Sequence, residues 1–386
     1  MAYHTTIFRQ MLQLIPRLEF QSIVNCYNGD YRIRKLTCWT QFVHLIFSQI
    51  SSRFSIRDIV RNTLFQRNKL YHLGASTVCR STLADANNKR PFQIYQDTFL
   101  RLYQRLNGLA PKYKLRLPTK LFIIDSTTID LCLTLFPWAR FRKTKGAIKL
   151  HTSLDADGNL PSFFYMTDGK VHDSKITPKF QIPKGSYLVF DRAYHDFNHY
   201  KSYQDNEIRF VTRMKTNAAY QVTETREIEK YTCVISDETI VFTGYQTHKK
   251  YPYPLRKIRF WDKENQKILV FLTNDFELSA KTIADIYKAR WEIELFFKTI
   301  KQNLKIKSFL GTSKNAVLTQ IWIAMIIYLI LSYLKFQFKS HFSIRSLIHL
   351  IQVNLFEGKS LKELILYGGA GPPLPIFCKQ QTMFSS

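Results

Sequence analysis

Acidic residues are scarce in this 386-residue chain. It has 29 Asp and Glu residues against 56 Lys and Arg residues, which gives a formal net charge of +27 and a sequence pI near 9.8. Because the basic excess is spread over the whole chain and is not confined to a tail, it points to a polyanionic partner. Nucleic acid is the first candidate for that partner, and an anionic membrane surface is the second.

The sequence also lacks the cysteine patterns of metal-binding and exported small domains. Its six cysteines are scattered and include no C-x-x-C pair. This argues against a zinc ribbon and leaves no disulfide framework, so we expect a protein of the reducing cytoplasm. The first residues, MAYHTTIFRQML, contain no uninterrupted apolar run, and we expect no signal peptide. The hydrophobic content of 45% is that of a globular protein, and 386 residues are enough for two or three domains.

Long apolar runs are rare, with one exception at residues 316–334. This segment is nearly long enough to cross a bilayer, yet it contains Gln320 and closely follows a polar helix. A lone membrane span there would separate the polar helix from its partners, so we predict a buried core helix. A basic protein anchored in a membrane is the alternative that this segment leaves open.

Residues 1–113 are predicted to be helical, since apolar residues recur at helical spacing in several segments. Among them, residues 80–90 form a short polar segment with Arg80 and Arg90 at its ends. Ser81 and Thr82 are candidate N-caps. One interpretation is the recognition helix of a helix-turn-helix unit, with both arginines contacting DNA. An exposed helix with a solvated face is the alternative that composition favours.

After Pro118 the pattern changes to strands. Residues 120–125 form an apolar run that ends on Asp125, and residues 187–190 form another that leads into Asp191. The other elements expected here are a hairpin of 147–154 with 160–166, a short helix at 173–180, a helix at 194–205 and a strand at 208–214. This order is typical of an RNase H-like core, an α/β (α+β) fold in which helices flank a mixed sheet.

The closing helix of such a core is delayed by residues 216–276, which we interpret as a β-rich insertion. Its expected strands are 232–235, 239–243, 255–261 and 267–273. Ser279 is the expected N-cap of the next helix. The predicted domains are a helical N-terminal domain (1–113), the core (114–215 and 277–335), the insertion (216–276), and a helical C-terminal region with a loose tail after Gly368 (336–386).

The helix after the insertion carries polar residues in one narrow stripe. Arg290, Glu294 and Lys301 follow Tyr287 at steps of three, four and seven residues. At about 100° per residue, these residues share one face of a single helix, and a neighbouring apolar stripe can pack on the core. The simpler interpretation is an amphipathic helix with an ordinary Arg290–Glu294 pair, worth a few tenths of a kcal/mol.

The spacing Tyr-x2-Arg-x3-Glu-x6-Lys resembles the YREK motif of DDE transposases of insertion-sequence family four. D-S-T at Asp125 and D-R-A-Y at Asp191 resemble the first two motifs of that family, and blocks such as TDGKVHD and IKSFLGTS are also similar to it. The resemblance extends from about residue 7 to residue 367. It implies an RNase H-like catalytic core with a β-rich insertion, preceded by an all-α N-terminal DNA-binding domain.

Three carboxylates are the expected catalytic and metal-binding residues: Asp125, Asp191 and Glu294. Two Mg²⁺ ions, for which Mn²⁺ can substitute, need only carboxylate and water oxygens as ligands and can serve both the attacking and the leaving oxygen of a phosphodiester. The resemblance implies that Tyr287, Arg290 and Lys301 hold phosphates of the transposon ends. The further candidate DNA-binding residues are Trp291, Lys298, Arg142, Lys143, Lys145, Arg80 and Arg90.

The activity that the resemblance implies is cut-and-paste transposition. Water nicks each transposon end, the freed 3′-hydroxyl forms a hairpin, the hairpin is reopened, and the 3′ ends join target DNA. The implied partners are double-stranded DNA, from terminal inverted repeats and target, and a second copy of the chain in a synaptic homodimer. No membrane is involved. A catalytically silent DNA-binding protein derived from a transposase is the alternative function.

One feature departs from the family pattern. Some relatives have a tryptophan, which stacks on a flipped base, where this chain has Leu269. Trp261 and Trp291 are the remaining candidates for stacking.

Overall fold

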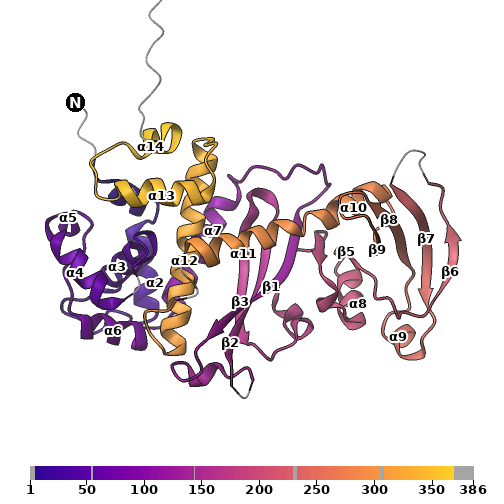
Figure 1. Cartoon of the computed structure of the whole chain (residues 1–386), viewed down its shortest axis with the longest axis horizontal. Helices are drawn as coiled ribbons and strands as arrows, with labels where there is room; N and C mark the ends of the chain where they lie inside the picture. Colours follow the sequence, from indigo (N-terminus) through magenta and orange to yellow (C-terminus); the bar gives the residue numbers. More distant parts are fainter. Residues whose placement is uncertain are drawn as a thin grey trace, which may run out of the picture.

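The computed structural model describes residues 5–53, 55–142, 144–228, 233–304, 306 and 308–368. Within these residues a single nine-stranded sheet extends through the molecule (Figure 1). Helices from the N-terminal and C-terminal parts of the chain gather at the β3 end of this sheet, and the β-rich insertion forms its other end.

The described part of residues 1–113 is helical, as predicted. Its helices are α1 (Ile7–Leu12), α2 (Arg17–Cys26), α3 (Cys38–Ile50), α4 (Ile56–Phe65), α5 (Arg67–His72), α6 (Arg80–Lys89) and α7 (Gln93–Asn107). Thr37 and Ser55 cap α3 and α4 by accepting backbone N–H groups. The predicted caps of α6 are wrong, because Cys79 is its N-cap and Ser81 and Thr82 lie inside its first turn.

The sheet has the order β3-β2-β1-β4-β5-β9-β8-β7-β6. Its first five strands are β1 (Leu121–Leu131), β2 (Gly146–Asp155), β3 (Leu160–Asp168), β4 (Tyr187–Phe190) and β5 (Arg209–Arg213). β1, β4 and β5 are parallel, and β2 and β3 form the antiparallel hairpin. This topology confirms the predicted RNase H-like core with its mixed sheet.

The β-rich insertion extends the core sheet, because β9 pairs antiparallel with β5. Its strands are β6 (Tyr220–Thr225), β7 (Val234–Phe242), β8 (Leu255–Asp262) and β9 (Lys267–Thr273), with the short helix α9 (Tyr245–Lys250) between β7 and β8. The two runs predicted at 232–235 and 239–243 belong to one strand, β7, except at their ends: Cys233 and Thr243 flank the strand, and Thr232 lies outside the described residues. Neither β6 nor α9 was predicted.

The remaining helices follow the order expected for the core and the C-terminal region. They are α8 (Phe197–Asp205), α10 (Ala280–Lys288), α11 (Trp291–Asn303), α12 (Lys314–Gln337), α13 (Ile344–Asn354) and α14 (Leu361–Tyr367). Ser279 caps α10, as predicted, by accepting the N–H of Thr282. Gly368 ends α14 in the left-handed conformation (φ 66°), which glycine adopts without strain. The predicted loose tail lies outside the described residues.

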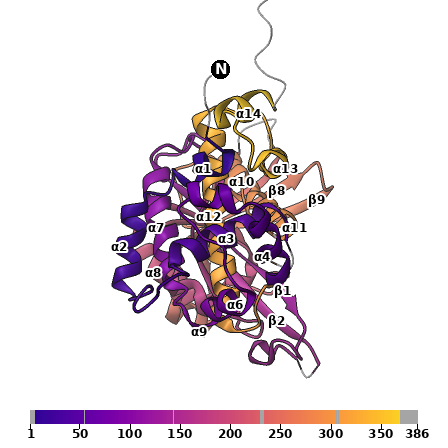
Figure 2. The same cartoon turned by 90° about the vertical axis from the view of Figure 1, so that its left-hand side faces the viewer.

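Helix α12 is the core helix that the sequence predicts. In the described part of the chain it alone is long and apolar enough to cross a membrane, and 94% of its most apolar window is buried inside the protein. It packs against α3, α6, α7 and β3, and Figure 2 shows the N-terminal helices in front of it. The Gln320 amide donates to the Ser308 carbonyl (2.7 Å) and accepts from the Leu310 N–H (2.9 Å), so this polar side chain is satisfied inside the protein.

Candidate active site

Asp125 and Asp191 come from adjacent parallel strands. Ile124 pairs with Phe190 in the β1–β4 ladder, so the two aspartates follow at neighbouring positions. Neighbouring strands lie about 4.8 Å apart, which places both carboxylates at one spot on the sheet. β1 does not end at Asp125, as the apolar run predicted, but continues to Leu131 because its polar second half pairs with β2. β4 does end at Phe190, and Asp191 begins a 3-10 turn.

Tyr287 lies on α10, Glu294 and Lys301 lie on α11, and Arg290 lies at the junction between the two helices, so the prediction of one uninterrupted helix is wrong. α10 ends at Lys288 and α11 begins at Trp291. At the junction, the Arg290 N–H bonds to the Tyr287 carbonyl, three residues back, in a tightened turn. Ala289 and Arg290 both keep right-handed helical dihedral angles, so the side-chain periodicity continues across the junction.

Arg290 joins two of the three carboxylates. Its Nη1 donates to Asp125 Oδ2 (3.4 Å), and its Nη2 donates to Glu294 Oε1 (2.6 Å). The Arg290 side chain is only 19% exposed, and its guanidinium lies 5.9 Å from the ring centre of Tyr287, which is itself buried. The planar Arg290 guanidinium bridges one carboxylate from β1 and one from α11, and this contact fixes the position of α11 over this part of the sheet.

The site holds an excess of negative charge. Burial raises the pKa of Asp125 to about 6, and the neighbouring Asp191 and Glu294 add to this rise, while the Ser126 N–H and Arg290 oppose it. Burial also raises the pKa of Tyr287, with a contribution from Asp191. The charge of Asp191 thus raises the pKa of both Asp125 and Tyr287. The three predicted carboxylates therefore converge, although they are far apart in the sequence.

We expect the Asp125→Asn variant to be more stable than the wild type in metal-free solution near neutral pH. The pKa of this acid rises from 3.8 in the unfolded chain to about 6 in the folded protein. At pH values above 6 the charged carboxylate therefore destabilises the folded state, and at pH values below 3.8 it does not, because the group is protonated in both states. The expected gain of the variant is about 2–3 kcal/mol above pH 6. Thermal unfolding in EDTA at several pH values measures it.

The matched control for this prediction is Asp130→Asn, on the same strand, because Asp130 is 66% exposed. A stability difference between wild type and Asp125→Asn that is the same at about pH 5 and about pH 7.5 would contradict the prediction.

Comparison with known proteins identifies the family. The family described as "Transposase DDE domain" matches residues 116–330, which is more than half of the chain. The chain belongs to the DDE transposases. Residues 3–76 also match a domain of unknown function, DUF4372.

Two relatives agree with this assignment in sequence. The chain is 35% identical over 252 residues to a protein of Sinorhizobium fredii described as a transposase. The aligned region covers 64% of this chain and 69% of that protein. It is 30% identical over 261 residues to a protein described as the transposase for insertion sequence element IS5377 of Geobacillus stearothermophilus, with coverage of 67% and 68%. A solved structure of a piggyBac transposase synaptic complex with hairpin DNA is similar at a TM-score of 0.48 and 11% identity, covering 95% of this chain and 82% of that chain.

DDE transposases work with divalent metal ions, and the donor set of this transposase suits such an ion. Carboxylate oxygens are the ligands that Mg²⁺ prefers, and the candidate ligands here are the carboxylates of Asp125, Asp191 and Glu294. Among the described residues, no group of three or more His, Cys, Asp or Glu side chains is close enough to hold a metal ion. The Arg290 guanidinium instead compensates the charges of Asp125 and Glu294. A bound cation would take over that role.

A half-buried acid, Asp173, supports the strand that carries Asp125. Its carboxylate accepts from Ser126 Oγ (2.7 Å) and lies within ion-pair distance of Lys149 (3.4 Å) and His151 (3.3 Å). Although burial raises its pKa, hydrogen bonds from His151 and Ser126 and the charge of Lys149 lower it to about 2. The backbone N–H of Ser126 in turn donates to Asp125 Oδ1 (2.8 Å).

Sequence reasoning missed this role of Asp173. The available signal was the block TDGKVHD, which ends on Asp173 and was assigned no function.

Helix α11 presents further candidate DNA-binding residues around the junction. Trp291 is 58% exposed and Lys298 is exposed, so both are accessible to a ligand. Lys301 Nζ donates to the Thr128 carbonyl of β1 (2.9 Å), which ties the end of α11 to the strand that carries Asp125. Leu269 lies half-buried against the core. Trp261, in β8, is half-buried, whereas Trp291 is exposed, so Trp291 is the better of the two candidates for base stacking.

The basic segment that contains Arg142, Lys143 and Lys145 follows β1 and lies away from the three carboxylates. Leu131 pairs with Gly146 at the end of the β1–β2 ladder, roughly 20 Å along the strand from Asp125 at about 3.3 Å per residue. Arg142 is exposed there, and Lys145 pairs with Asp130 (3.1 Å). Lys143 lies outside the described residues. The structure thus does not bring this run to the carboxylates, although a duplex is wide enough to reach both.

The two arginines of the predicted recognition helix differ. Arg80 is exposed in the first turn of α6 and remains a candidate for DNA contact. The prediction that Arg90 contacts DNA is wrong. Only 7% of Arg90 is exposed, and its guanidinium donates to the Leu36 carbonyl and to Gln41 Oε1. A guanidinium that is buried and saturated by internal acceptors holds the helices together and cannot reach a phosphate.

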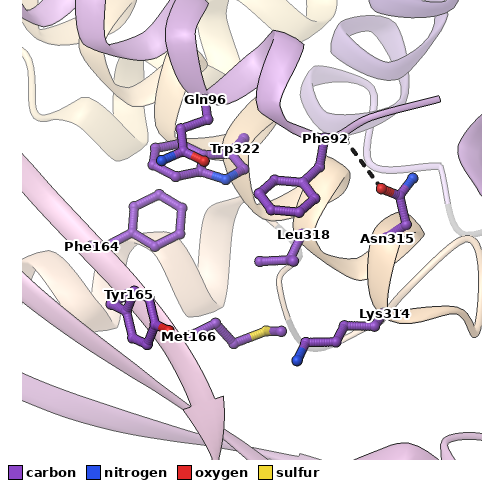
Figure 3. Close-up of a pocket in the computed structure, with 9 residues that line it drawn as sticks. All are labelled: Phe92, Gln96, Phe164, Tyr165, Met166, Lys314, Asn315, Leu318 and Trp322. Carbon is purple, nitrogen blue, oxygen red and sulfur yellow. Dashed lines mark hydrogen bonds between the residues drawn. The ribbon is translucent and has the colours of Figure 1, made fainter. Parts of the chain in front are cut away.

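A cavity of about 440 Å³ lies between α7, β3 and α12 (Figure 3). Its lining residues are Phe92, Gln96, Phe164, Tyr165, Met166, Lys314, Asn315, Leu318 and Trp322, none of which is acidic. Phe164 pairs with Thr152, which pairs with Asp125, and Thr152 is fully buried. The cavity is therefore separated from the carboxylates by the protein interior.

Proposed function

We propose that this transposase catalyses cut-and-paste movement of an insertion sequence and belongs to the YREK group of insertion-sequence family four. The observation that carries the proposal is the arrangement around Arg290. Asp125 and Asp191 occupy neighbouring positions of parallel strands, and Glu294 shares its guanidinium partner with Asp125. Three converging carboxylates in a protein of net charge +27 suit a site that acts on phosphodiesters.

Each residue of the site has a role in this proposal. Asp125, Asp191 and Glu294 would hold two Mg²⁺ ions, replaceable by Mn²⁺, which when bound activate an attacking oxygen and stabilise a leaving oxygen. Arg290 offers a planar fork and Lys301 a point charge to the phosphates of the transposon end. Tyr287 packs beneath the Arg290 guanidinium and keeps it aimed at the site.

One site serves every step because each step is the same in-line transfer. A new bond forms between phosphorus and the attacking oxygen while the bond to the leaving oxygen breaks. Water attacks first and nicks the strand, and the freed 3′-hydroxyl then attacks the opposite strand to form the hairpin. Water reopens the hairpin, and the 3′-hydroxyl finally attacks target DNA.

The partners in this proposal are double-stranded DNA and a second copy of the chain. The DNA consists of the terminal inverted repeats and the target. A homodimer follows from the need to cut both ends together. The reaction takes place in the bacterial cytoplasm, on DNA, with no membrane involved.

The proposal is tested with DNA that carries the termini of the element itself. We expect the purified protein to nick this DNA at the element boundary in Mg²⁺ or Mn²⁺ and not in EDTA. DNA of the same length without the termini is the control. Tight, salt-sensitive binding to the ends without any nicking in metal would contradict the proposal and indicate a protein that only binds DNA.

A further inference from the structure

The cavity between α7, β3 and α12, here called the α12 cavity, is a second candidate binding site (Figure 3). Its volume of about 440 Å³ is in the range of pockets that hold small organic ligands. We propose that the α12 cavity binds a small planar aromatic acid, whose ring lies against Trp322 and whose carboxylate lies at Lys314. The inference does not rest on the proposed function, because none of the three carboxylates of the candidate active site lines this cavity.

Trp322 supplies a hydrogen-bond donor that no acceptor of the described residues satisfies. Only 3% of this side chain is exposed, and its indole Nε1 is buried without a hydrogen-bond partner. In Figure 3 the nitrogen lies on the edge of the ring that is turned toward Phe92 and Leu318. A buried N–H group without a partner is costly, and nearly all such groups in proteins are satisfied. The indole N–H therefore marks the place for an acceptor atom of a ligand.

Apolar and aromatic side chains form the walls of the α12 cavity. The ring centroids of Phe164 and Trp322 lie 3.7 Å apart at an interplanar angle of 35°. Met166 follows Phe164 by two residues on β3, so both side chains lie on the same face of that strand. Leu318 and Phe92 complete the apolar lining. These walls suit a planar apolar ring.

The positive end of the α12 cavity is the start of α12. Lys314 is the first residue of this 24-residue helix, lines the cavity and is exposed. The N-terminus of a helix carries a partial positive charge, which adds to the charge of the ammonium group. None of the lining residues is acidic. An anionic group is therefore favoured at this end of the cavity.

The separation of the two polar ends sets the length of the ligand. Lys314 and Trp322 are eight residues apart on one helix, which at about 1.5 Å per residue separates them by roughly 12 Å along its axis. Leu318 lies midway, and steps of four residues keep all three on one side of the helix. A ligand that reaches both ends carries its acceptor atom opposite its carboxylate, with one or two aromatic rings between them.

Hydrogen bonds fix the frame of the α12 cavity before a ligand binds. Asn315 Oδ1 accepts the Phe92 N–H (3.2 Å). Its Nδ2 donates to the carbonyls of Asn87 (2.9 Å) and Arg90 (2.7 Å). These bonds tie the start of α12 to the turn between α6 and α7, so the walls need little reordering to bind a ligand. Because α7 precedes the core in the chain and β3 belongs to it, a bound ligand would bridge the N-terminal helices and the core.

The test uses three naphthalene probes. The probe 6-hydroxy-2-naphthoate has a carboxylate and, at the opposite end, a hydroxyl oxygen that can accept a hydrogen bond. The probe 2-naphthoate lacks the hydroxyl group, and the probe 2-naphthol lacks the carboxylate. Binding of each probe to the purified full chain is measured by ligand-observed NMR titration.

Two variants separate the two ends of the α12 cavity. Trp322→Phe removes the donor and keeps an aromatic ring, whereas Lys314→Gln removes the charge at an exposed position where the fold should not change. The matched control is Lys335→Gln, at the other end of the same helix. Thermal unfolding of each variant checks the fold.

We expect 6-hydroxy-2-naphthoate to bind the wild type with a dissociation constant on the order of 100 µM. Trp322→Phe should weaken this probe by ~3- to 10-fold and 2-naphthoate much less, because only the first probe loses a hydrogen bond. Lys314→Gln should weaken both acids by ~2- to 5-fold and leave 2-naphthol unchanged. The control should bind all three probes as the wild type does.

Three results would overturn the inference. The first is no saturable binding of 6-hydroxy-2-naphthoate at millimolar concentration, which would leave the α12 cavity to water. The second is an equal loss of both acids in Trp322→Phe, which would show that the indole N–H is not the donor. The third is unchanged binding of the acids to Lys314→Gln, which would place them elsewhere on this basic protein.

Discussion

Asp191→Asn is expected to abolish metal-dependent nicking at the transposon ends, with a rate loss of at least ~1,000-fold. Asp191 directly follows the last residue of β4, which pairs with Ile124 of β1, and it begins a 3-10 turn. The amide has the shape of the carboxylate but not its charge, so it cannot replace the carboxylate as a metal ligand. Nicking of end DNA in Mg²⁺ by wild type and variant measures the effect.

This first prediction separates chemistry from binding. Because the substitution is nearly isosteric at a half-buried position, the variant should still fold and bind end DNA with the affinity of the wild type. Asp130→Asn, an exposed acid on β1, is the control and should nick normally. Normal nicking by Asp191→Asn would show that Asp191 is not a ligand, and lost DNA binding would show that its role is structural.

Arg290→Ala is expected to lower the nicking rate by ~100-fold, and Arg290→Lys by ~10-fold. Arg290 bridges Asp125 and Glu294 in the structure, and in the reaction it is proposed to bind a phosphate. Alanine removes both functions. Lysine keeps a charge but lacks the planar fork, so it cannot engage two oxygens in the same geometry.

The same substitution should change the response of stability to metal. Without Arg290, the charges of Asp125 and Glu294 are left uncompensated, and the metal-free variant should lose roughly 1–3 kcal/mol. Mg²⁺ should then raise the melting temperature of Arg290→Ala more than that of the wild type, because the ion takes over the compensation.

The control for the Arg290 variants is Lys281→Ala, an exposed cation of α10 that pairs with Asp285. An equal response of Arg290→Ala and wild type to Mg²⁺, together with normal nicking, would contradict both roles of Arg290.

Much of the core could be predicted because its signals are local. The apolar runs before Asp125 and Asp191 marked two strands, and Ser279 marked the start of α10 through its hydrogen bond to the Thr282 N–H. Such features depend on neighbours within a few residues. The continuation of β1 to Leu131 was missed because the polar half of that strand is stabilised by pairing with β2, which lies far along the chain.

The candidate site shows the same limit at the level of single residues. Arg80 and Arg90 carry the same charge at the ends of one helix, yet only Arg90 is buried against Gln41. Asp173 and Asp125 are both acids of family-like blocks, and the structure makes the first a partner of Ser126 and the second a partner of Arg290. Residue type alone does not distinguish these roles.

The sequence by itself determined the residue types of the site, the helical spacing of Tyr287, Arg290, Glu294 and Lys301, the strand that precedes each aspartate, and a positive charge suited to DNA. Only the tertiary structure decided that the β-rich insertion joins the core sheet, that α10 and α11 meet at Arg290, and that Arg90 is buried while Arg80 stays exposed. Periodicity and charge are carried by neighbouring residues, whereas strand pairing, burial and ion-pair partners depend on contacts between segments that the linear order does not relate.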